Sequence, residues 1–137
     1  MAVVKIAIEH GGAIIVDSTR KGKHFPDSFN RTIPIWTCVI NRALHQLKKE
    51  QTNNNTNNND VTIPDEYDWH SLHMPRWISP SEQSQVEERL PKFVEKLLGV
   101  LHLTPQNQLD ELLALKYVFI LNSMPQIYLT VVINIII

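Results

Sequence analysis

The sequence predicts a mixed α/β domain, and one apolar run and two sets of helix signals carry that prediction. Residues 13–16 (AIIV) are apolar throughout, which is typical of a strand covered on both faces of a sheet. An amphipathic helix is predicted from Pro34, and two further helices are predicted to start near Ser79 and Thr104. We therefore expect a fragment of a mixed α/β domain with a short buried strand, an amphipathic helix and a C-terminal helical hairpin.

The helix expected from Pro34 follows a long loop over residues 17–32. Proline suits the first turn of a helix, and the apolar residues that follow recur at the spacing of one helical face: Trp36, Val39, Ile40, Ala43, Leu44 and Leu47. The next segment, residues 51–60 (QTNNNTNNND), contains no apolar side chain to bury. We expect it to be a disordered surface insertion within the domain.

The C-terminal half carries two helix starts. Ser79, Pro80 and Glu82 give an N-cap, a first-turn proline and a glutamate three residues on, and apolar residues then share one face: Val86, Leu90, Phe93, Val94, Leu97 and Leu98. Thr104 and Pro105 repeat the signal before Leu109, Leu112 and Leu113. The spacing predicts a helical hairpin.

Charge is distributed unevenly along a chain whose net charge is −1. Residues 17–49 hold seven Lys or Arg against two acids, which indicates a local anion site rather than a broad nucleic-acid-binding face. A single cysteine, Cys38, excludes an internal disulfide framework and fits a reducing, cytoplasmic setting. We interpret Cys38 as a small buried hydrophobe, since nothing in the sequence indicates a group that activates it.

The strongest candidates for binding chemistry follow the predicted strand directly. Ligands of open α/β sheets bind in the loops after the strands, and this loop combines hydroxyls with cations that suit phosphate: Ser18, Thr19, Arg20, Lys21 and Lys23. Asp17 is either a ligand for Mg²⁺ and sugar hydroxyls or the cap of a turn. Arg42 lies on the following helix, where it faces either this site or solvent. The histidines lack metal-ligand spacing, so no metal site of the protein itself is predicted.

The same residues resemble a known family. DSTRKGK at 17–23, TIPIW at 32–36 and NRA at 41–43 are similar to the signature of the initiator tRNA phosphoribosyl transferases, and LHMPRWIS at 72–79 agrees in order and spacing. The resemblance covers roughly residues 7–116. It implies transfer of a 5-phosphoribosyl group from phosphoribosyl pyrophosphate, with Mg²⁺, to the ribose 2′-hydroxyl at position 64 of initiator tRNA. This modification would exclude that tRNA from elongation.

The resemblance also implies roles and missing parts. Asp17 would be the catalytic residue, and the side chains that bind substrate phosphates would be Ser18, Thr19, Arg20, Lys21, Lys23 and Arg42. Family members continue into a phosphatase-like domain with its own anion-binding loop, and no Cys-x5-Arg occurs here. We therefore expect residues 1–116 to be a partial N-terminal domain, inactive or poorly active alone. The alternative is a non-catalytic module that binds anions, RNA or a partner helix.

The last segment, residues 117–137, contains no charged side chain. On hydropathy alone it could be a C-terminal membrane anchor, but Pro125, Gln126 and Asn134 interrupt it and no cluster of cations flanks it. We interpret this tail as aberrant sequence, such as a translated intron, and expect no membrane partner.

Overall fold

The elements of the chain are a helical group and a small sheet. The computed structural model describes residues 6, 9–10, 12–16, 27–54, 68–105, 109–110, 113, 117–123 and 130–136, with backbone alone along the strands. Its helices are η1 (Ser28–Thr32), α2 (Ile33–Asn54), α3 (Pro80–Glu87) and α4 (Leu90–Leu101). Its strands are β1 (Gly12–Val16), β2 (Tyr117–Ser123) and β3 (Thr130–Ile136).

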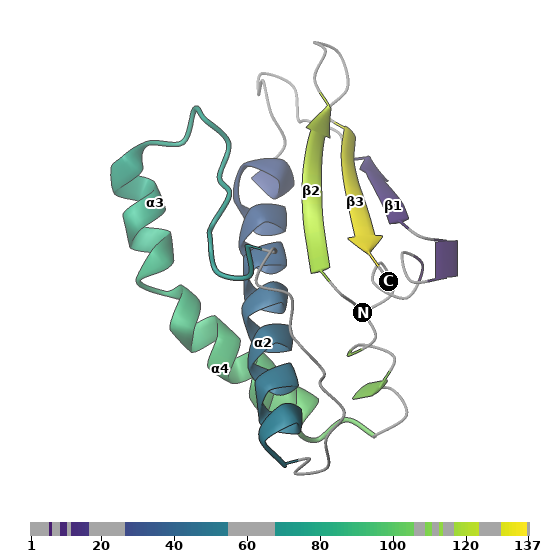
Figure 1. Ribbon diagram of the computed structural model, residues 1–137. Coiled ribbons are helices and arrows are strands. Elements are labelled where there is room, and N and C mark those ends of the chain that lie inside the picture. Colours follow the sequence, from purple (N-terminus) through teal and green to yellow (C-terminus); the bar gives the residue numbers. More distant parts are fainter. Residues whose placement is uncertain are drawn as a thin grey trace.

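Helix α2 is the centre of the molecule, with α4 across one side and β2 beside the other (Figure 1). Its apolar stripe and that of α4 form one core of buried side chains, which includes Ala43, Leu47, Leu90, Val94 and Leu98. Ala43 and Leu90 are fully excluded from solvent. Because interiors pack at high density, this interface fixes how α4 lies across α2. The predicted amphipathic face of α2 is thereby confirmed.

The helix around α2 is longer than the sequence predicts at both ends. Residues 28–32, expected to be loop, form a turn of π-helix that runs directly into α2 at Ile33. Phe29 is 3% exposed, so burial of its ring favours an ordered helical turn here over a loop. Residues 51–54, expected to be disordered, form the last turn of α2. Extension of an existing helix adds a hydrogen bond for each residue, so this turn forms without an apolar contact of its own. The rest of that insertion, residues 55–60, lies outside the described residues.

The predicted helix from Ser79 is divided into α3 and α4. Ser79 is the N-cap of α3, and its Oγ accepts a hydrogen bond from the Glu82 N–H at 3.2 Å, which confirms the predicted start. Pro91 lacks an N–H and its ring would clash with the carbonyl group four residues earlier, so one continuous helix cannot form. The break leaves Phe93 39% exposed, although the sequence predicts it on the buried face.

Beyond α4, the predicted start of the next helix is described in part. The Leu109 N–H donates to the Pro105 carbonyl oxygen at 3.1 Å, as in a helical turn. Leu109 and Leu113 are partly buried against the α2–α4 core. Leu112 lies outside the described residues. None of the described helices is both long enough and apolar enough to cross a membrane.

The three strands form an antiparallel sheet in the order β1-β3-β2. Strand β3 is central and pairs with both neighbours, with Ile14 opposite Val132 and Ile120 opposite Ile133. Figure 1 shows this sheet on the side of α2 away from α3 and α4. Both β2 and β3 come from residues 117–137.

The fold class predicted from the sequence, a mixed α/β domain, is wrong for the described core. The buried apolar side chains that the structure describes lie on η1, on α2, on α4 and in the segment 69–75. A strand at residues 13–16 was expected to sit inside a covered sheet, but β1 pairs antiparallel with the tail strand β3. The apolar faces of α2 and α4 are buried against each other, as in domains built from helices packed on helices.

Candidate functional site

The residues predicted from the sequence to form the site are only partly described. Asp17 and its neighbours in the loop lie outside the described residues, so their roles stay predictions: Ser18, Thr19, Arg20, Lys21 and Lys23. Arg42 is described, half-buried on α2. The structure therefore locates one predicted site residue and shows what surrounds it.

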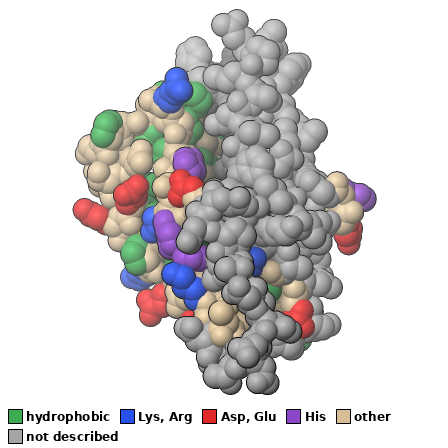
Figure 2. All heavy atoms as spheres, in the orientation of Figure 1, with side chains coloured by type: hydrophobic (Ala, Val, Ile, Leu, Met, Phe, Trp, Pro, Cys, Tyr) green, Lys and Arg blue, Asp and Glu red, His purple; other side chains and the backbone are tan. Residues whose placement is uncertain are grey.

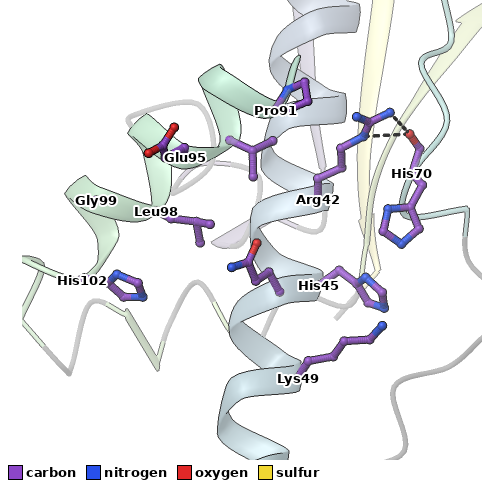
Figure 3. Close-up of a pocket in the computed structure, with 11 residues that line it drawn as sticks. Arg42, His45, Lys49, His70, Pro91, Glu95, Leu98, Gly99 and His102 are labelled. Atoms are coloured by element: carbon purple, nitrogen blue, oxygen red, sulfur yellow. Dashed lines mark hydrogen bonds between the residues drawn. The ribbon is translucent and has the colours of Figure 1, made fainter. Parts of the chain in front are cut away.

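Arg42 holds the segment 68–72 against α2. Its Nε and Nη2 both donate to the carbonyl oxygen of His70, at 2.9 and 2.5 Å (Figure 3). The Sγ of Cys38, one turn earlier on α2, is 3.7 Å from the same oxygen. The guanidinium Nη1 takes no part in these bonds. Arg42 is thus in part a structural residue, and its Nη1 forms neither of the two bonds to His70.

Cys38 confirms the interpretation of a small buried hydrophobe. It is 3% exposed and belongs to the α2–α4 core. Burial raises the pKa of its thiol, and the nearby Arg42 guanidinium offsets part of that rise. The neutral thiol is therefore the dominant form at neutral pH, which does not suit a nucleophile.

A hydrogen-bonded turn fixes the other end of the same segment. Oδ1 of Asp68 accepts from the N–H groups of Ser71 at 2.9 Å and His70 at 3.4 Å, and its Oδ2 lies 3.1 Å from His73 Nε2. Partial burial favours the protonated acid, but the bonds from Ser71 and His70 and the His73 imidazole outweigh it and lower the pKa of Asp68. An ionised aspartate therefore holds this turn.

Stacked rings lie where the segment meets α2. The imidazole of His45 is nearly parallel to the Trp69 ring, with centroids 5.6 Å apart, and the His70 ring meets it edge-on at 4.7 Å. Lys48 Nζ lies 5.4 Å from the centroid of the Trp69 ring. His45 and Trp69 are both buried. These contacts give His45 a defined orientation at the edge of an adjoining hollow.

That hollow is a groove along α2, bounded by α4 and by His70, with a volume of about 750 Å³ (Figure 3). Helix α2 supplies its polar floor, namely Arg42, His45, Gln46 and Lys49. Helix α4 and the residue after it supply the opposite wall: Pro91, Val94, Glu95, Leu98, Gly99 and His102. We call this the α2–α4 groove. Its volume is within the range of sites that hold small molecules or parts of larger ligands.

Polar contacts connect the two helices at one end of the groove. The Gln46 side-chain amide donates to Oε1 of Glu50 at 3.2 Å, and Oε2 of Glu50 lies 3.5 Å from His102 Nε2. Both members of the Glu50–His102 pair are about half exposed, so the pair adds little stability but orients His102. The Gln46 carbonyl oxygen is not used in this contact.

The groove is positive overall, with a carboxylate on one wall. Arg42 and Lys49 carry permanent charge, three imidazoles add polar donors or acceptors, and Glu95 is the single acid among the lining residues. Figure 2 shows His, Lys and Arg side chains interspersed with Asp and Glu on the described part of the visible face. Within the described residues, no group of three His, Cys, Asp or Glu side chains could hold a metal ion. The two cations of the lining can attract an anion.

Sequence reasoning predicted Arg42 but missed the rest of the groove. Arg42, Gln46 and Lys49 recur at the spacing of one helical face, so a polar stripe beside the apolar stripe of α2 was visible in the sequence. Glu95 and His102 could not be linked to that stripe, because only the packing of α4 on α2 brings them opposite it.

Comparisons with known proteins identify the family. The family model described as the Rit1 N-terminal domain matches residues 1–132. The chain belongs to the Rit1 N-terminal domain family. This confirms the resemblance to the initiator tRNA phosphoribosyl transferases, and the match continues past residue 116, where the motifs recognised in the sequence end.

Two curated relatives place this Rit1 N-terminal domain within longer proteins. It is 32% identical over 104 residues to the tRNA A64-2′-O-ribosylphosphate transferase of Saccharomyces cerevisiae, which covers 76% of this chain and 18% of the relative. It is 31% identical over 87 residues to the uncharacterized protein C3F10.06c of Schizosaccharomyces pombe, which covers 64% of this chain and 16% of the relative. No solved structure matches the chain. The chain thus spans less than one fifth of the length of these relatives.

Proposed function

We propose that this chain is part of a cytoplasmic transferase that moves a 5-phosphoribosyl group from phosphoribosyl pyrophosphate to the ribose 2′-hydroxyl at position 64 of initiator tRNA. The identity of 32% to the yeast tRNA A64-2′-O-ribosylphosphate transferase carries this proposal. The product is a tRNA with an added anionic group in its T stem, which would exclude it from elongation. In this proposal the chain contributes a portion of the site, and a phosphatase-like domain contributes another anion-binding loop.

The donor is assigned to the loop after β1. Arg20, Lys21 and Lys23 would bind phosphate oxygens, with Ser18 and Thr19 as additional hydrogen-bond donors. Phosphoribosyl transfer builds positive charge on the ribose ring while pyrophosphate departs, so the site has to hold the 5-phosphate and place the acceptor hydroxyl in line. Asp17 would orient the sugar hydroxyls. Mg²⁺ would arrive with the pyrophosphate and neutralise its charge.

The second candidate is a non-catalytic module that binds anions or RNA. One observation favours it: the α2–α4 groove places the cations Arg42 and Lys49 in one hollow, where they can attract an anion independently of residues 17–23. The two candidates differ in whether the chain recognises the donor.

Donor binding distinguishes the two. Calorimetric titration of the 137-residue chain with phosphoribosyl pyrophosphate should show Mg²⁺-dependent binding that Arg20→Ala and Lys23→Ala each weaken at least tenfold. Lys96→Ala, which removes an exposed cation on α4, is the matched control and should bind as the unmodified chain does. A folded chain that binds tRNA but gives no heat with the donor would favour the binding module over the transferase.

A further inference from the structure

The α2–α4 groove has two walls of different chemistry. Lys49 and Arg42 place positive charge along α2, whereas Glu95 places a carboxylate on α4 across the groove (Figure 3). Gln46 lies on α2 with the cations, and its carbonyl oxygen is not used in the bond to Glu50. A ligand that fills this groove therefore meets cations along α2 and a carboxylate on the α4 wall.

An RNA backbone has the complementary pattern. Its phosphates accept hydrogen bonds and attract cations, and its 2′-hydroxyls also donate hydrogen bonds, which a carboxylate accepts. We propose that the α2–α4 groove binds the sugar-phosphate backbone of RNA, with Lys49 and Arg42 Nη1 at a phosphate and Glu95 at a neighbouring 2′-hydroxyl. The proposal rests on the proposed function insofar as it identifies this RNA with the acceptor tRNA.

The lining favours RNA over the small-molecule donor as the source of the phosphate. A pyrophosphate carries several negative charges close together, and Glu95 in the lining and Glu50 beside it would repel them. A backbone phosphate carries one charge, which Lys49 and Arg42 can match. The 2′-hydroxyl distinguishes RNA from DNA, so Glu95 gives the groove a means of selecting RNA.

The groove also has room for a backbone at Gly99. This residue lines the wall on α4, and a Cβ atom built there would meet no atom within 4 Å. A strand can therefore approach the helix backbone closely at this position. A large side chain at Gly99 would occupy the space without any change of charge.

Charge reversal in the groove tests the phosphate contact. Binding of the 137-residue chain to a 12-base-pair RNA hairpin should weaken about tenfold in Lys49→Glu, and the salt dependence of log K should lose about one unit of slope. Lys96→Glu makes the same charge change on the exposed side of α4 and should weaken binding less than threefold. Lys49→Gln, a milder variant checked by circular dichroism, should weaken binding about threefold to fivefold. Equal losses in Lys49→Glu and Lys96→Glu, or no RNA binding by the unmodified chain, would overturn the proposal.

Removal of the carboxylate tests the ribose contact. In Glu95→Ala, affinity for a DNA hairpin of the same sequence should rise twofold to fivefold because a negative charge is lost, whereas the preference for RNA should fall toward one. A preference for RNA that is unchanged in Glu95→Ala would overturn the assignment of Glu95 to a 2′-hydroxyl.

Two further measurements separate this inference from the proposed function. Gly99→Leu should weaken RNA binding at least fivefold and Gly99→Ala should not; equal affinity in both would contradict a ligand inside the groove. The affinity of Lys49→Glu for phosphoribosyl pyrophosphate should equal that of the unmodified chain. If Lys49→Glu instead binds the donor more weakly and RNA equally well, the groove is a donor site and the proposal is wrong. Failure of the unmodified chain to bind the donor would count against the proposed function alone.

Discussion

Arg42 is the one predicted site residue that lies within the described part of the chain. It was predicted to bind substrate phosphate, and in the structure two of its three guanidinium nitrogens hold the His70 carbonyl oxygen. The fork of a guanidinium allows this division, since its donors point in fixed and separate directions. Arg42 can therefore orient the segment 68–72 and still present Nη1 to the groove.

The structural half of this role predicts a loss of stability. Arg42→Gln removes hydrogen bonds from a charged donor to His70, so the free energy of unfolding should fall by about 1–2 kcal/mol. Urea denaturation measures this change. Arg76→Gln is the matched control: Arg76 is exposed, and its replacement should change stability by less than about 0.5 kcal/mol. Equal free energies of unfolding for Arg42→Gln and the unmodified chain would show that the bonds to His70 do not stabilise the fold.

Asp68 predicts how stability depends on pH. Its pKa is lowered in the folded chain, so its ionised form stabilises the fold above the unfolded pKa, near the ordinary value of 3.8. That contribution is lost as the pH falls through the lower, folded pKa. Melting temperatures of the unmodified chain and Asp68→Asn should therefore differ at pH 6, and the difference should shrink as the pH falls below 3.8. A difference that stays constant from pH 6 to pH 3 would contradict the role of the charge.

At the scale of elements, the sequence predicted those features that depend only on residue spacing and capping within a segment. The apolar stripe of α2 and the Ser79 cap of α3 follow from spacing and from capping chemistry, and both are confirmed. The π-turn at Ser28–Thr32 was missed, because the burial of Phe29 depends on the folded surroundings, which no local pattern reveals. The division between α3 and α4 could have been predicted, since Pro91 was a visible helix breaker.

Replacement of Gly99 tests whether this glycine lowers the stability of α4. Glycine inside a helix costs about 0.5–1 kcal/mol relative to alanine, and here an added methyl group would meet no atom within 4 Å. Gly99→Ala should therefore raise the free energy of unfolding by about that amount in urea denaturation. Lower stability in Gly99→Ala would mean that the space beside α4 is smaller than the structure shows.

At the scale of the whole molecule, the sequence predicted the family better than the fold. Contiguous motifs such as DSTRKGK identify a family without any knowledge of packing, and the match to the Rit1 N-terminal domain confirms them. The α/β class depended on the position of one short strand, and four apolar residues cannot show which partner strand they will find. The groove was missed for the same reason, since its two walls lie about fifty residues apart in the sequence.

The boundaries proposed from the sequence stay predictions. The division at residue 116 and the interpretation of residues 117–137 as aberrant both rest on where the recognised motifs end. The family match runs to residue 132, and the tail supplies two strands of the described sheet. Sequencing the transcript across Lys116 distinguishes a native tail from a translated intron.

The central claim is that this chain is part of an enzyme that transfers a phosphoribosyl group to a 2′-hydroxyl of tRNA. The most direct measurement replaces the matched segment of the yeast transferase with this chain and supplies phosphoribosyl pyrophosphate labelled in its 5-phosphate. We predict that label enters initiator tRNA, that a tRNA with 2′-deoxyribose at position 64 stays unlabelled, and that Arg20→Ala with Lys23→Ala abolishes labelling. A chimera that folds and binds tRNA but transfers no label, or labels the 2′-deoxy tRNA equally, would contradict the claim.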